Sequence, residues 1–222
     1  MPEWPKGAVC KIAGLAFTGS NPVPATAPGP LGGRAPLSSP TVNLDGPELH
    51  LRPLAVADAS ALLELRVRER EFLTPFEPLR NDRFFTLEAQ REQIEQGLQD
   101  WAQDRGYGFG IFYRDSNELI GRVALSNVVR GAWQNATLGY FIASAYNGRG
   151  LASQAVGLAV GYAFSEVKLH RVQAGVMPRN QASAKVLINN GFRYEGRSPR
   201  YLRINGVWED HDLYALTVED HS

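Results

Sequence analysis

The stretch from residue 136 to residue 164 constrains the fold more than any other part of this chain. Residues 136–142 (Ala-Thr-Leu-Gly-Tyr-Phe-Ile) are β-branched, aromatic or small and predict a strand. A glycine-rich turn at 147–150 follows, and the apolar run 151–164 predicts a largely buried helix. A strand that leads through such a turn into a buried helix indicates an α/β arrangement in which the helix packs on a sheet.

The turn itself predicts an anion site. Gly148 and Gly150 permit a positive φ angle and leave backbone N–H groups uncovered, and a helix N-terminus adds roughly half a positive charge. An ordinary structural turn is the simplest alternative. A Walker loop would require Gly-Lys-Ser/Thr, and a dinucleotide fingerprint would end in Gly where this chain has Ser153, so both fit poorly. In the helix, Gly157 and Gly161 predict a face that packs closely against the sheet.

Composition narrows the class of protein. The 222 residues are 44% hydrophobic and 21% charged, which suits one domain, and 23 Lys+Arg balance 23 Asp+Glu, so no global field favours nucleic acid or an anionic membrane. The single cysteine, Cys10, excludes an internal disulfide and a cysteine-based zinc site. The four histidines lack metal-ligand spacing, so no metal is expected. The longest apolar run falls short of the roughly 20 residues of a membrane span.

The chain divides at about residue 48. Residues 1–47 hold nine of the fourteen prolines and predict a disordered or loosely docked extension, followed by a domain at 48–217 and a tail at 218–222. We expect a mixed, mostly antiparallel sheet of about seven strands with helices on both faces. The expected elements are a strand at 49–54, helices from Asp58 and from Thr86 to Gln103, strands at 107–113 and 119–129, a strand at 171–176, a helix at 179–190 and a hairpin at 197–216 turning at Asn205-Gly206. The charged run 66–71 fits a solvated helix face or the rim of a substrate groove.

Two motifs resemble those of a known superfamily. The segment 147–152 resembles the Q/R-x-x-G-x-G/A loop that holds the pyrophosphate of acetyl-coenzyme A (acetyl-CoA) in the GNAT superfamily of N-acetyltransferases, with Asn147 in the Gln/Arg position. Asn-x-x-Ser at 180–183, Gly-Phe at 191–192 and Asn-Gly-Val-Trp at 205–208 resemble its RimJ/RimL branch, which acetylates the N-termini of ribosomal proteins. The resemblance covers residues 48–217. It implies the GNAT fold, an α/β (α+β) fold with splayed central strands, and acetyl-CoA as donor.

The resemblance also implies site residues. Many members place a tyrosine where this chain has Leu187, so Ser183 is expected to donate a hydrogen bond or proton to the departing thiolate, and Asn180 to cap the helix and reach a ligand. The pantetheine arm would pair with the backbone of β-strand residues after Gly139, where a bulge would open the sheet. The expected cofactor-binding residues are Tyr140, Phe141, Ile142, Asn147, Gly148, Arg149, Gly150, Leu151, Ala152, Ser153, Asn180 and Ser183.

The acceptor side is less well defined. A neutral amine must attack the thioester, and an α-amine with a pKa near 8 is easier to deprotonate than a lysine near 10.4. Candidates for the base are Glu77, Glu209, Tyr201 and Tyr140, of which Glu77, Tyr201 and Glu209 are also expected to line the substrate groove. We therefore expect a cytoplasmic RimJ-like enzyme, a monomer or weak homodimer, that acetylates an N-terminal alanine or serine of a ribosomal protein by direct attack. Acetylation of a small-molecule amine and non-catalytic sensing of acyl-CoA are the alternatives.

Overall fold

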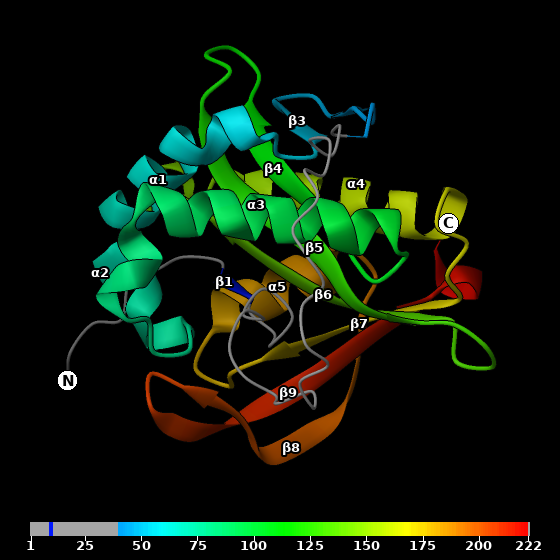
Figure 1. Ribbon diagram of the computed structural model, residues 1–222. Helices are drawn as coiled ribbons and strands as arrows, with labels where there is room; N and C mark the ends of the chain where they lie inside the picture. Colours follow the sequence, from blue (N-terminus) through cyan, green and yellow to red (C-terminus); the bar gives the residue numbers. More distant parts are fainter. Residues whose placement is uncertain (1–8, 11–39, 222) are drawn as a thin grey trace, which may run out of the picture.

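The computed structural model describes residues 9–10 and 40–221, which build one sheet (Figure 1). The strand order is β2-β3-β4-β5-β6-β7-β9-β8, and β1 pairs with β6 outside this path. Every neighbouring pair is antiparallel except β6 and β7. The strands are β1 (Val9–Cys10), β2 (Leu44–Asp45), β3 (Leu49–Arg52), β4 (Tyr107–Tyr113), β5 (Leu119–Val129), β6 (Asn135–Ile142), β7 (Arg171–Val176), β8 (Arg193–Ile204) and β9 (Val207–Thr217).

The seven strands predicted from the sequence, β3 to β9, are confirmed. β1 and β2 are additional, and both come from the segment that the composition assigns to an N-terminal extension. The rest of that prediction falls on residues 1–8 and 11–39, which lie outside the described residues.

Helices cover both faces of the sheet, and each face has its own apolar core. Figure 1 shows α1 and α3 in front of the sheet and α4 behind it. One core lies under α1 and α3, and the other lies under α4 and α5. The helices are α1 (Ala59–Arg68), α2 (Arg70–Leu73), α3 (Leu87–Ala102), α4 (Leu151–Ser165) and α5 (Gln181–Asn189). No helix within residues 9–10 and 40–221 is long and apolar enough to cross a bilayer.

Helix starts follow the capping chemistry at two of three predicted sites. The Thr86 hydroxyl accepts the Ala89 N–H at 3.3 Å, and the Asn180 carbonyl oxygen Oδ1 accepts the Ser183 N–H at 3.2 Å, so both predicted caps are confirmed. Asp58 occupies the N-cap position of α1 as predicted, but its side chain makes no capping hydrogen bond. The carboxylate instead accepts the Ala55 N–H and forms an ion pair with Arg52, both at 2.7 Å.

The central strands separate after three residues, which confirms the splayed sheet. β6 pairs with β7 only over Asn135–Thr137, because β7 then follows β9 as far as Val176. The bulge predicted at Gly139 is wrong, since the register between β5 and β6 is regular from Gly121 to Ser126. β1 lies in the opening, beside β7 and α5, and its two residues pair with Phe141 and Tyr140.

The glycines of α4 do not face the sheet, contrary to the sequence prediction. A Cβ on Gly157 would lie 3.0 Å from Oδ1 of Asn190, just after α5, whereas one on Gly161 would meet nothing within 4 Å. The sheet-facing side of α4 is instead formed by fully buried residues such as Ala155 and Ala159. Gly157 thus permits close packing of α4 on the end of α5.

Candidate active site

The turn before α4 forms a cradle of unbonded amides, residues 148–153. Gly148 and Gly150 have φ angles of 77° and 78°, which confirms the predicted positive φ, and a Cβ on either would meet nothing within 4 Å. Gly150 caps α4 without any side-chain hydrogen bond. In the part of the chain that the structure describes, no acceptor takes the backbone N–H of residues 148–153. These donors and the helix dipole together favour an anionic ligand.

The side chains of the cradle point away from those amides. Leu151 and Ala152 are buried and anchor the start of α4, and Ser153 Oγ accepts a hydrogen bond from Asn190 at 3.0 Å. The Arg149 guanidinium lies over the Tyr113 ring, 4.9 Å from its centroid, beside a hollow of about 520 Å³. Asn147 buries Oδ1 without a hydrogen-bond partner among the described residues. Ligand recognition here therefore falls to the backbone.

The start of α5 brings Ser183 against Tyr140 of β6. The Tyr140 hydroxyl lies 3.1 Å from the Ser183 carbonyl, to which it can only donate, and 2.9 Å from the Ser183 hydroxyl, where either oxygen can be the donor. Both residues are buried, with exposed fractions of 0% and 1%. Asn180 precedes Ser183 as the N-cap residue of α5. Three of the residues expected at the site thus meet at the opening between β6 and β7, next to β1.

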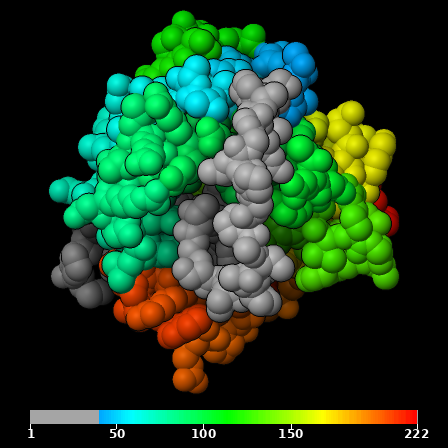
Figure 2. Space-filling view, viewed as in Figure 1, coloured from blue at the N-terminus to red at the C-terminus, as the bar shows by residue number. Residues whose placement is uncertain are grey.

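The three residues expected in the substrate groove lie in two places. Glu77 is 4% exposed and forms an ion pair with Arg66 at 2.8 Å. Glu209 and Tyr201 belong to the β8–β9 hairpin, where Glu209 pairs with Arg179 at 2.8 Å. Figure 2 shows this orange hairpin below the blue-green residues of α1–α3, and the Asn205 N–H donates to the Glu77 carbonyl at 2.7 Å.

His211 of β9 is a candidate base that the sequence reasoning missed, because it considered histidines only as metal ligands. The residue is 1% exposed, and its ring lies 5.6 Å from that of Tyr201. Nδ1 lies 3.0 Å from the Glu209 carbonyl, which can only accept, so Nδ1 carries the proton and Nε2 keeps a lone pair. Burial lowers the pKa of His211 below its ordinary 6.5, so the ring is neutral at pH 7.

This burial predicts a pH effect on stability. The pKa of His211 is lower in the folded than in the unfolded chain, so the unfolded chain binds the proton more readily. The contribution of His211 is complete above pH 6.5 and is lost as the pH falls through the folded pKa. We expect the difference in melting temperature between wild type and His211→Gln to shrink from pH 7.5 to pH 5, as measured by differential scanning calorimetry. A constant difference would contradict the neutral buried ring.

The sequence was compared with those of known protein families. Residues 48–193 match the acetyltransferase (GNAT) domain family. The chain belongs to the GNAT family of N-acetyltransferases. The mixed sheet with splayed central strands agrees with the GNAT fold that the sequence resemblance implied.

Two GNAT relatives and one solved GNAT structure illustrate the similarity. The chain is 45% identical over 177 residues to the probable N-acetyltransferase YjcK of Bacillus subtilis, covering 80% of this chain and 98% of YjcK. It is 35% identical over 181 residues to the [ribosomal protein uS5]-alanine N-acetyltransferase of Escherichia coli, covering 82% and 93%. The structure of Mycobacterium smegmatis RimJ in complex with CoA-disulfide superposes with a TM-score of 0.74 at 33% identity, covering 77% of this chain and 82% of that one.

Proposed function

We propose that this N-acetyltransferase transfers an acetyl group from acetyl-CoA to the N-terminal α-amine, alanine or serine, of a ribosomal protein. The donor is acetyl-CoA. The observation that carries the proposal is the cradle of unbonded amides at 148–153, which lies at one end of an opening in the sheet that has Ser183 and Tyr140 beside it. The E. coli relative, which acts on an alanine of ribosomal protein uS5, supports this choice of acceptor.

Donor binding requires more than the cradle. A charge at a helix N-terminus contributes about 0.3 to 2 kcal/mol, whereas micromolar affinity requires about 8 kcal/mol. The edge of β6 that β7 leaves after Thr137 runs along Tyr140, Phe141 and Ile142, and β1 pairs there with Phe141 and Tyr140, so a donor would take the place of β1. A pantetheine arm that paired with this edge would run from the cradle towards the start of α5.

Each step of the transfer then has a candidate residue. The neutral amine attacks the thioester carbonyl, and His211 Nε2 takes a proton from the resulting ammonium, directly or through water. When the tetrahedral intermediate collapses, the C–S bond breaks and the thiolate leaves. The Ser183 hydroxyl donates its hydrogen bond or proton to that thiolate, and the adjacent Tyr140 hydroxyl is positioned to replace it.

An α-amine suits this site better than a lysine. Deprotonating a lysine with a pKa of 10.4 at pH 7 costs about 4.6 kcal/mol, compared with about 1.4 kcal/mol for an α-amine near 8. The test is thiol release from acetyl-CoA with three acceptors: peptides starting with Ala or Ser, N-terminally blocked peptides with one lysine, and a small polyamine. Turnover on the polyamine but not on peptides would reject the acceptor class. Tight CoA binding with no thiol release for any amine would indicate a sensor instead.

The position of β1 predicts that removing it changes donor affinity. β1 pairs with Phe141 and Tyr140, the same edge that the pantetheine arm would use. We expect deletion of residues 1–10 to tighten CoA binding several-fold in isothermal titration calorimetry, because the donor no longer displaces a strand. An unchanged or weaker affinity would mean that β1 and the donor do not compete.

A further inference from the structure

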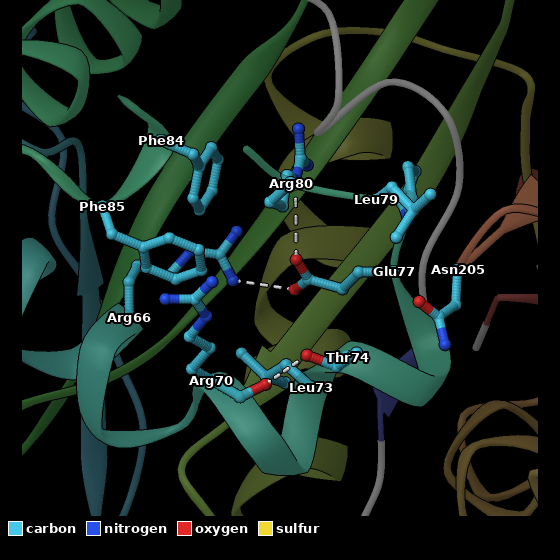
Figure 3. A pocket seen from close by; sticks show the side chains of 11 residues that line it. Arg66, Arg70, Leu73, Thr74, Glu77, Leu79, Arg80, Phe84, Phe85 and Asn205 are labelled. Carbon is cyan, nitrogen blue, oxygen red and sulfur yellow. Dashed lines mark hydrogen bonds and ion pairs between the residues drawn. The ribbon is translucent and has the colours of Figure 1, made fainter. Parts of the chain in front are cut away.

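A second, separate cavity of about 260 Å³ lies between α1, the turns at 74–85 and the β8–β9 hairpin. Figure 3 shows Arg66 and Arg80 on either side of Glu77, with Phe84 and Phe85 beside them and Asn205 opposite. The charged run 66–71 therefore contains a buried member, since Arg66 is only 3% exposed. Arg68 and Arg70 are about half exposed, so the solvated helix face describes them but not Arg66.

The cavity is short of acceptors for its guanidinium groups. Arg66 Nη1 donates to Glu77 at 2.8 Å, and Arg80 Nε lies 3.7 Å from the same carboxylate, too far for a hydrogen bond. Arg122 of β5 is 9% exposed, and no hydrogen bond or ion pair joins its side chain to any residue that the structure describes. Arg66 Nε, Arg80 Nε, Arg80 Nη2 and Arg122 Nε are all buried without a hydrogen-bond partner.

These three arginines, the arginine cluster, repel one another. The pKa of Arg66 is lowered mainly by burial and further by the charges of Arg122 and Arg80. The pKa of Arg122 is lowered to about 10, mainly by burial and further by the charge of Arg80. The Phe84 ring lies 4.9 Å from Arg66 and 4.4 Å from Arg80, and Phe141 lies 4.7 Å from Arg66. Cation–π contacts to these rings offset only part of the cost of leaving the buried guanidinium N–H groups without hydrogen bonds. An added anion would satisfy the remaining donors.

We propose that the arginine cluster binds a carboxylate carried by the acceptor molecule, an inference that rests on the proposed function. A planar carboxylate matches the paired donors of a guanidinium. Arg66 and Arg80 share the single carboxylate of Glu77 in this cavity, and Arg122 adds a third cation whose Nε has no partner. The Phe141 ring connects the cavity to the β6 edge, because Arg66 packs on it. An acceptor that approaches the opening from the α1/α3 face of the sheet, the face on which Phe141 lies, would thus pass this anion site.

Matched acceptors test this inference and identify the source of the carboxylate. We would measure kcat/KM for Ala- or Ser-starting peptides with Asp or Glu at positions 2 to 4, for the same peptides with Asn or Gln, and for free alanine against alaninamide. If acidic peptides react at least 10-fold faster than their amide counterparts, the bound carboxylate belongs to a side chain. If free alanine reacts at least 10-fold faster than alaninamide, the bound group is an α-carboxylate. Equal rates in both comparisons would overturn the proposal.

Three variants localise the effect. Arg80→Gln removes two of the unpaired donors and is expected to abolish the acid preference. Arg83→Gln is the control, because the Arg83 side chain lies on the same turn, is 62% exposed and pairs with Glu92 at 2.7 Å. The Arg83→Gln variant should keep the acid preference. Arg122→Met retains bulk and removes an unpaired buried charge, so it should lose the preference without losing thermal stability. An acid preference unchanged in both Arg80→Gln and Arg122→Met would overturn the assignment to this cavity.

A binding measurement separates this inference from the acetyl transfer itself. Acetate titrated against chloride at constant ionic strength should raise the melting temperature of the wild type and of Arg83→Gln, but not that of Arg80→Gln. If acetate stabilises in this pattern while no acceptor turns over, the anion site stands and the proposed function fails. If acceptors turn over with no acid preference and acetate has no effect, the function stands and the anion site fails.

Discussion

Gly150→Val is expected to reduce kcat/KM for acetyl-CoA at least 100-fold, with most of the loss in CoA affinity. The φ angle of 78° is strained for a β-branched residue, at about 1 to 3 kcal/mol. The new side chain also projects into open space from the cradle, where the pyrophosphate is proposed to lie. Calorimetric titration with CoA measures the loss of affinity, and steady-state kinetics with a peptide acceptor measure the loss in kcat/KM.

Gly131→Val is the matched control for Gly150→Val. Gly131 has a φ angle of 72° and equally open space around its missing Cβ, but it lies in the exposed turn between β5 and β6. The two variants should lose a similar amount of thermal stability, so strain alone cannot distinguish them. A CoA affinity that falls equally in both variants, or in neither, would contradict the cradle as the pyrophosphate site.

Ser183→Ala is expected to lower kcat about 100-fold, within the usual range for general acid catalysis, while the Kd for CoA changes less than three-fold. The reason is that the hydroxyl acts on the departing thiolate, whereas the cradle holds the donor. Tyr140→Phe removes the hydroxyl that lies 2.9 Å from Ser183 Oγ and should lower kcat by a smaller factor. Single-turnover measurements with a good acceptor peptide isolate the chemical step.

The control for Ser183→Ala is Ser126→Ala. The Ser126 hydroxyl on β5 donates to the Thr137 carbonyl at 3.2 Å, so this variant also loses one serine hydrogen bond, about 1 kcal/mol of stability. It should keep full kcat. If Ser183→Ala loses stability like Ser126→Ala and turns over at the wild-type rate, Ser183 has a structural role only.

Features set by neighbouring residues were predictable from the sequence. The positive φ angles in the cradle, the caps at Thr86 and Asn180 and the turn at Asn205-Gly206 each depend on a few consecutive side chains. The bounds of β4, β5 and β7 agree with the predicted strands for the same reason, because alternation and turn residues mark strand ends locally.

Features that depend on distant partners could not be predicted. Arg66, Arg80 and Arg122 come from a helix, a turn and a strand, and no local pattern shows that they lie close together in the fold. The splay was placed at Gly139 because glycine permits bulges, whereas the cause is the pairing of β7 with β9 near the end of the chain. His211 likewise becomes a candidate base only because β7 and β8 flank β9.

The short parallel pairing of β6 and β7 has a consequence for the local dynamics of the sheet. Beyond Thr137 the backbone of β6 that faces β7 is protected by β1, which pairs at Tyr140 and Phe141. The rates at which these amides exchange their hydrogens for deuterium therefore depend on the segment or ligand that occupies the opening. Exchange at these positions, followed by mass spectrometry, would slow whenever the opening is filled and rise whenever it empties.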